Sequence, residues 1–105
     1  MKHLVIHRHC IRDDLRNLKL DENEIIQHYK ALEVICNLFK SIGNEQVIMY
    51  DIGLPEDVVK YVNIGDEIML YGAYKEECLK KAKIALESKG IKVNYHPEGC
   101  VGFED

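Results

Sequence analysis

The chain has 105 residues, 47% of them hydrophobic, and a formal net charge of −4. A chain of this length buries one core and predicts a single domain over residues 1–105. The acidic balance argues against a nucleic-acid or anionic-membrane partner, since no cluster of basic and aromatic residues offsets it. The apolar runs are far shorter than the roughly 20 residues of a membrane span. The N-terminus, MKHLVIHRHC, lacks a signal peptide's apolar region. We therefore expect a cytoplasmic protein with reduced cysteines.

The first half of the chain predicts a strand, an irregular segment and a long helix. HLVIH, residues 3–7, is a β-branched run typical of a strand. Residues 11–20 contain three leucines without a clear period and predict a loop or flap. Asp21 and Glu24 have the spacing of a capping box. Apolar residues then recur every three or four positions over 25–42, which predicts an amphipathic helix that ends at Gly43.

The second half alternates apolar runs with helical segments. It predicts strands over 47–50, 67–71 and 91–95, a short helix that opens at 54–57 and runs through 62, and a helix over 75–89. Strands joined by helical crossovers form a parallel sheet with right-handed connections. The expected fold is a three-layer α/β/α Rossmann-like domain with a mainly parallel four-stranded sheet. Its unprotected edge strands favour a homodimer.

Titratable and sulfur-bearing residues are concentrated where the predicted strands end. In chain order they are His7, His9, Cys10, Asp51, Gly72, Tyr74, Cys78, His96 and Cys100. Ligands of α/β sheets gather at this edge, so the concentration predicts a site. Asp13 and Asp14 could form a carboxylate pair, but adjacent residues of an extended segment point apart, so we expect them to be solvated. His3 and His28, for which the sequence suggests no partner, are expected at the surface or at an edge.

Cys78 has two interpretations. In the first turn of a helix its thiolate is favoured by unpaired backbone N–H groups, which would make it a nucleophile with His7, His9 or His96 as base. Alternatively it is a core residue, because it shares a helical face with two alanines. The adjacent Glu76 and Glu77 would also raise the pKa of its thiol.

The remaining rim residues also have two interpretations each. Asp51 is a general base or ligand contact, or it caps the following turn, which we favour. Tyr74 lines a pocket mouth or covers the sheet edge, and His96 and Gly72 are further candidate ligand contacts. A transition-metal site would use imidazole and thiolate ligands from His7, His9, Cys10, His96 and Cys100, although their spacing matches no standard zinc motif. No glycine-rich phosphate loop is present, so a dinucleotide cofactor is not expected.

From its third predicted strand onward the chain resembles the isochorismatase-like cysteine hydrolases, the group that contains nicotinamidases. The segment EIMLYGAYKEECLKKAKIALESKGIKV has Gly72, Cys78 and Gly90 at the family's spacing, and the tail PEGCVGFED is similar as well. The resemblance implies that Cys78 is the nucleophile and that amides near Tyr74 and Cys78 form an oxyanion hole. It covers about 40 residues. At the place of the family's first-strand aspartate stands His7 or His9, and its catalytic lysine has no counterpart.

Three functions follow from these observations. We favour a small-molecule-binding or regulatory module that uses the rim without chemistry, because the catalytic aspartate and lysine are missing. The second is a thiol-dependent, hydrolase-like enzyme that acts through Cys78 on an uncharged or weakly polar metabolite. The third is a metal-binding protein that uses the histidines and cysteines named above.

Overall fold

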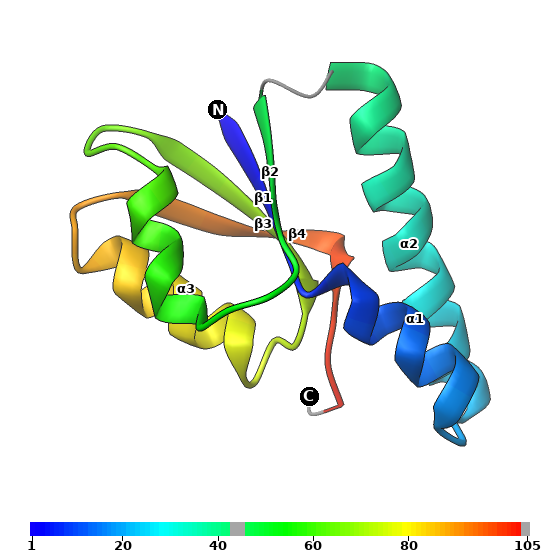
Figure 1. Ribbon diagram of the computed structural model, residues 1–105. Coiled ribbons are helices and arrows are strands. Elements are labelled where there is room, and N and C mark those ends of the chain that lie inside the picture. The colour runs from blue at the N-terminus through cyan, green and yellow to red at the C-terminus, as the bar shows by residue number, and fades with distance from the viewer. Residues whose placement is uncertain (43–45, 104–105) are drawn as a thin grey trace.

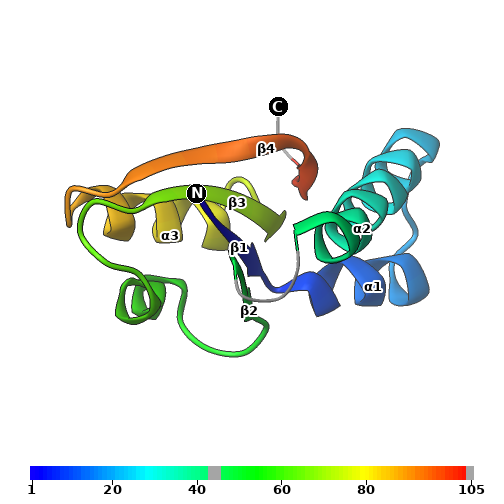
Figure 2. The same ribbon diagram turned by 90° about the horizontal axis from the view of Figure 1, so that it is seen from above.

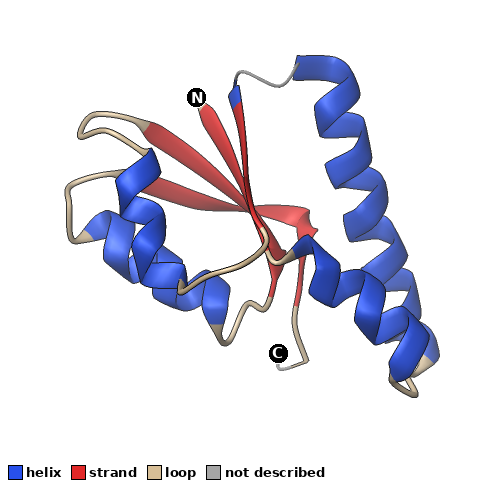
Figure 3. Cartoon of the chain, in the orientation of Figure 1, coloured by secondary structure: helices blue, strands red, loops and turns tan. Residues whose placement is uncertain are grey.

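The computed structural model describes residues 1–42 and 46–103, and the expected stop at Gly43 lies outside them. The elements in chain order are β1 (Lys2–Ile6), α1 (Arg8–Asn17), α2 (Glu22–Ile42), β2 (Val47–Tyr50), the 3₁₀ helix η2 (Pro55–Tyr61), β3 (Glu67–Ala73), α3 (Cys78–Glu87) and β4 (Lys92–Val101). Figure 3 shows helices and strands alternating along most of the chain.

The four strands form one parallel sheet in the order β2-β1-β3-β4. Val5 of the central strand β1 pairs with Met49 of β2 on one side and with Tyr71 of β3 on the other. Figure 1 shows the strands side by side, with α1 and α2 on one side of the sheet and α3 on the other. The predicted α/β class with a parallel four-stranded sheet is confirmed.

Alternate residues of the strands supply two separate cores. Leu4 and Ile6 face the core shared with η2 and α3, whereas Val5 faces the core shared with α1 and α2. The same alternation separates Leu70 from Tyr71 in β3. Because both faces are covered, the central strands are apolar over residues 4–6 and 68–71, after polar residues at their first positions. Figure 2 shows this layering from above.

The expected loop over 11–20 is wrong, because most of it belongs to helix α1. This helix begins one residue after β1, and His7 makes the turn in the left-handed conformation (φ 52°, ψ 46°). The buried positions of α1 are Ile11 and Asp14, whereas Leu18 is exposed. Ile11, Leu15 and Leu18 recur at i, i+4 and i+7, a helical spacing that the expectation of a loop overlooked, although the other inward position is polar.

Helix α2 begins as its sequence predicts. The Asp21 N–H donates to Glu24 Oε1 at 2.9 Å, and the Glu24 N–H donates to Asp21 Oδ1 at 2.8 Å, which is the reciprocal pattern of a capping box. Despite its 21 residues, neither α2 nor any other helix within 1–42 and 46–103 has the length and apolar character to cross a membrane.

The last strand is longer than expected and contains a bulge. Leu70 pairs with Tyr95, but Gly72 pairs with Cys100, so residues 96–99 bulge opposite a single residue of β3. The His96 ring stabilises this bulge, since its Nδ1 accepts the Gly99 N–H at 3.0 Å and the Glu98 N–H at 3.2 Å. The expectation that His96 and Cys100 follow the strand end is therefore wrong, and both belong to β4.

Candidate functional site

Two residues predicted for the rim hold the β1–α1 turn in place. The His7 N–H donates to Tyr50 O at 3.0 Å, and its Nε2–H donates to Gly53 O at 3.3 Å. Asp51, at the end of β2, accepts the Arg8 N–H at 3.1 Å through its Oδ1. A carboxylate at a helix N-terminus satisfies a free N–H and interacts favourably with the helix dipole. Asp51 thus caps α1, rather than the turn that follows its own strand.

His9 and Cys10, in the first turn of α1, form a thiol–imidazole contact near Asp51. Cys10 Sγ lies 3.5 Å from His9 Nε2, and His9 Nδ1 lies 3.9 Å from Asp51 Oδ1. The pKa of the Cys10 thiol is raised, first by burial and then by the carboxylates of Asp14 and Asp13. The resting group is therefore a neutral thiol beside an exposed imidazole.

Cys78 lies in the first turn of α3, as predicted, but the helix begins at this residue and not at 75. Its side chain packs against the core beneath η2 and α3. Burial raises the pKa of its thiol, Lys81 opposes this, and Glu77 and Glu56 add to it. Its half-buried side chain and raised pKa favour the core interpretation over an activated nucleophile. The carbonyl of Tyr74 accepts the N–H groups of both Glu77 and Leu79 at 3.0 Å, so these two amides are engaged within the turn.

A buried hydrogen-bonded cluster joins Tyr74 to α1 and α2. The Tyr74 hydroxyl donates to Asp14 Oδ2 at 2.7 Å, and His28 Nε2 lies 3.2 Å from the same oxygen. The other ring nitrogen, His28 Nδ1, donates to Glu24 O at 2.7 Å. Asp14 is 7% exposed and His28 is fully buried, so the expectations of a solvated aspartate and a surface histidine are wrong. Burial and the bond to Asp14 raise the pKa of Tyr74.

His96 lies elsewhere in the fold, on the sheet face that α2 covers. Its ring stacks on Tyr71 with 5.1 Å between centroids and an angle of 24°, while the Tyr71 hydroxyl lies 2.8 Å from His3 Nδ1. Gly72 is buried inside the sheet with φ at +118°, and any Cβ there would collide with the Ile6 carbonyl. These contacts give both residues structural roles.

The side chains named for a metal site are not grouped into one within the part of the chain that the structure describes. Among residues 1–42 and 46–103, no group of three or more histidine, cysteine, aspartate or glutamate side chains could hold a metal ion. Cys100 is 1% exposed, and its Sγ donates to Leu70 O at 3.2 Å. Its burial raises the pKa of the thiol to about 12, so it stays protonated and is a poor ligand.

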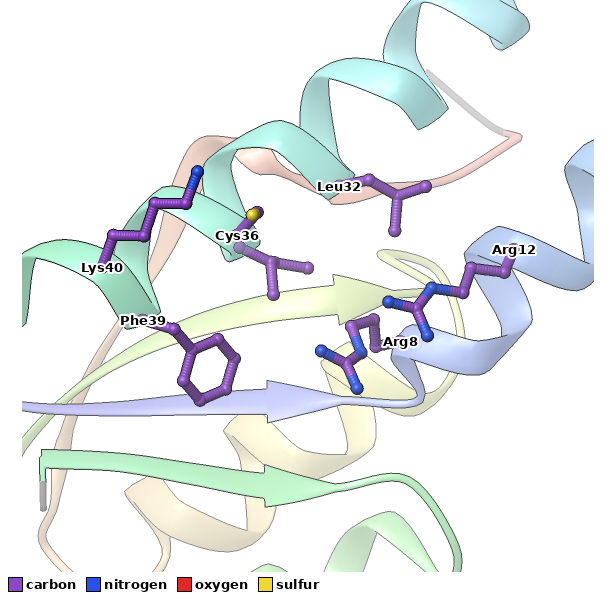
Figure 4. Close-up of a pocket in the computed structure, with 7 residues that line it drawn as sticks. Arg8, Arg12, Leu32, Cys36, Phe39 and Lys40 are labelled. Atoms are coloured by element: carbon purple, nitrogen blue, oxygen red, sulfur yellow. The ribbon is translucent and has the colours of Figure 1, made fainter. Parts of the chain in front are cut away.

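A hollow of about 480 Å³ opens between α1 and α2, and we call it the α1–α2 pocket. Its lining residues are Arg8, Arg12, Leu32, Ile35, Cys36, Phe39 and Lys40. Figure 4 shows the Phe39 ring and the Leu32 side chain on one side of the space, with the guanidinium groups of Arg8 and Arg12 pointing toward each other opposite them. Since Arg8 directly follows β1, the pocket adjoins the predicted rim.

The α1–α2 pocket carries uncompensated positive charge. Within the part of the chain that the structure describes, neither arginine nor Lys40 forms an ion pair. The Nε atom of Arg8 is buried and has no hydrogen-bond partner among those residues. This N–H is out of reach of a pocket ligand as the side chain lies, so it is the positive charge of Arg8, Arg12 and Lys40 that suits the pocket to an anion. The pocket can thus accept an acidic group.

Sequence reasoning missed the pocket because it missed helix α1. Arg8 and Arg12 are four residues apart, a spacing that puts two side chains on one helical face. A prediction of a helix over 8–17 would therefore have placed the two arginine side chains side by side. Their convergence with Phe39 and Lys40 also depends on how α1 packs on α2, which no local pattern encodes.

No family model matches this chain, and no curated protein or solved structure matches it significantly. The resemblance to the isochorismatase-like hydrolases therefore stays a prediction that rests on the residues named above. The arrangement of side chains alone carries the functional argument that follows.

Proposed function

We propose that this protein is a small-molecule-binding module whose ligand occupies the α1–α2 pocket. The observation that carries the proposal is a hollow of about 480 Å³ that combines an apolar floor with two guanidinium groups that form no ion pair within residues 1–42 and 46–103. Small-molecule sites are typically concavities of about 300–1,000 Å³, largely apolar and with a few polar groups that orient the ligand. This assignment keeps the predicted function and moves its site from the rim itself to the helices beside it.

A regulatory role follows from where the pocket lies. Arg8 belongs to the pocket through its side chain and to the rim through its N–H, which Asp51 accepts. Phe39 packs against the core that contains Val5 and Ile35. A bound ligand would therefore stabilise the junction between β1, α1 and α2. The proposed regulatory effect is that this junction becomes more rigid when the ligand binds.

A thermal-shift screen against a metabolite library tests this function. A ligand that binds only the folded state contributes about 2.7 kcal/mol at a concentration of about 100 Kd. In a domain of this size each kcal/mol raises Tm by about 4–8 °C. Cys36 lines the pocket and is exposed, so Cys36→Trp would fill the space and Cys36→Ser is the matched control. We expect compounds that stabilise the parent, Cys36→Ser and Cys78→Ser but not Cys36→Trp. The proposal would be contradicted if a compound raised the Tm of Cys36→Trp as much as that of the parent, or if no compound raised the Tm of the parent.

A thiol-dependent enzyme is the second candidate, and the contact between Cys10 and His9 favours it. His9 lies 3.5 Å from the sulfur and 3.9 Å from Asp51, the order of groups that general-base activation of a thiol requires. In such an enzyme His9 would take the Cys10 proton as sulfur attacks an acyl carbon, and would return it to the leaving group. Water would then hydrolyse the thioester. This places the nucleophile at Cys10 instead of Cys78.

Alkylation by iodoacetamide, followed by peptide mass spectrometry, distinguishes an activated Cys10 from an ordinary thiol. If His9 serves as its base, Cys10 reacts at neutral pH and His9→Asn slows it by about tenfold or more. Cys78, whose pKa is raised by burial and by the carboxylates of Glu77 and Glu56, serves as the internal reference. Reaction of Cys10 only above about pH 8, unchanged in His9→Asn, would reject the enzyme.

We retain two further proposals from the sequence, a homodimer and a cytoplasmic location. The dimer is supported by edge strand β2 and by apolar side chains exposed near it, with Ile52 at 90% and Leu54 at 65%. Light scattering of the purified protein would give twice the 12.2 kDa chain mass for a dimer; a mass equal to one chain would reject it.

A further inference from the structure

We infer that the ligand of the α1–α2 pocket is an amphipathic organic anion, with a carboxylate or phosphate on the two arginines and an apolar body against Phe39 and Leu32. This inference rests on the proposed function and adds the chemical class of the ligand. It follows from the charges, the packing of Arg8 and the division of the pocket into two sides.

The charged side of the pocket selects an anion. Arg8 and Arg12 lie one turn apart on α1, and their guanidinium groups point toward each other (Figure 4). Guanidinium groups offer a planar fork of N–H donors that matches carboxylate and phosphate oxygens. Lys40 adds a third positive charge from α2. A cationic ligand would be repelled by all three groups.

The packing of Arg8 distinguishes this pocket from an ordinary basic surface. Surface arginines are mostly solvated along their length. Here the Nε atom of Arg8 is buried and lacks a partner among residues 1–42 and 46–103. A ligand in the pocket would therefore contact the terminal nitrogens of this guanidinium group and not Nε, which a water molecule does not reach.

The apolar side sets the rest of the ligand. Ile35 is 1% exposed and forms the floor, while Leu32 and Phe39 are partly buried around it. The exposed part of this surface is suited to a flat ring or a short alkyl chain, which gains about 25 cal/mol for each Å² removed from water. An inorganic anion would use only the arginines, so we expect it to bind more weakly than an anion with an apolar body.

Isothermal titration calorimetry with a matched probe set tests the class. The probes are 4-phenylbutyrate, 4-phenylbutyl phosphate, the neutral 4-phenylbutanamide and inorganic phosphate. We expect one or both acids to bind at least about tenfold more tightly than the amide, because the amide offers the arginines no negative charge. We expect a similar advantage over inorganic phosphate, because that ion makes no apolar contact. Which acid binds better identifies the headgroup.

Variants show where the probes bind. They also distinguish the claim that the pocket binds a ligand from the claim that this ligand is an anion. Arg8→Gln and Arg12→Gln should each weaken the acids by about tenfold. Arg16→Gln, an arginine of the same helix outside the pocket, should change affinity less than about twofold; circular dichroism checks that each variant is folded. Equal affinity for acid and amide, or equal effects of Arg16→Gln and Arg12→Gln, would overturn the anion class and leave a neutral-ligand module standing. If none of the probes binds but the screen yields a neutral pocket ligand, the class alone fails. If neither binds, both proposals fail.

Discussion

Replacement of Asp14 by alanine should destabilise the domain far more than replacement of its neighbour Asp13. Asp14 is 7% exposed and accepts hydrogen bonds from Tyr74 and His28, the latter fully buried. The alanine would leave the buried imidazole and the tyrosine hydroxyl without their acceptor. Each buried polar group left without its partner costs about 1–3 kcal/mol, and two such groups amount to a large part of the roughly 5–15 kcal/mol that stabilises a typical domain.

Urea unfolding of the two alanine variants, followed by circular dichroism, measures this difference. Asp13 is exposed and is the matched control, because the same charge is removed one residue away. Asp13→Ala should lose less than about 0.5 kcal/mol. Asp14→Asn keeps an acceptor oxygen but not the charge, so it should fall between the two. If Asp13→Ala and Asp14→Ala lost similar stability, the buried cluster would not hold α1, α2 and β3 together, and the reasoning would be refuted.

Further predictions concern backbone geometry and pH. Gly72→Ala should be much more destabilising than Gly65→Ala in the same urea assay. Both glycines have positive φ, which costs an alanine about 1–2 kcal/mol of strain. Only at Gly72 would the added Cβ also collide with backbone atoms, those of Ile6. Similar losses would contradict the close approach of β1 and β3. Burial raises the pKa of Cys100 from 9.0 to about 12, so the folded state favours the protonated thiol. Its contribution to stability is complete below about pH 9 and is lost as pH rises toward 12. The decline in unfolding free energy over this range should be shallower in Cys100→Ala, and a decline of equal slope would argue against the shift.

Much of the fold could be predicted because its signals are local. The capping box at Asp21 and Glu24 forms the expected hydrogen bonds, and β2 occupies the residues that its apolar run predicts. Helix α1 also carries a local signal, since Ile11, Leu15 and Leu18 recur at i, i+4 and i+7, but the prediction of a loop missed it. Its inward positions include Asp14, whose burial is tolerated only because His28 and Tyr74, distant in sequence, supply partners.

The candidate site was harder to predict than the fold. His9, Cys10 and Asp51 lie close together because β1 and β2 are parallel neighbours in the sheet. That neighbourhood depends on the order of the strands, which the sequence pattern does not reveal. His96 seemed part of the same rim because β4 was expected to end at Tyr95. The bulge that His96 itself stabilises instead carries the strand on to Val101. Neither a bulge nor a pocket between packed helices has a signature within one segment.

Protein-observed NMR with 4-phenylbutyrate tests the central claim most directly. If the α1–α2 pocket binds this anion, amide shifts should change in a saturable way at Arg8, Arg12, Leu32, Cys36 and Phe39. Residues of α3 on the opposite face should stay unchanged (Figure 1). Shifts that are absent at high ligand concentration, or that fall mainly on α3, would contradict a binding site between α1 and α2.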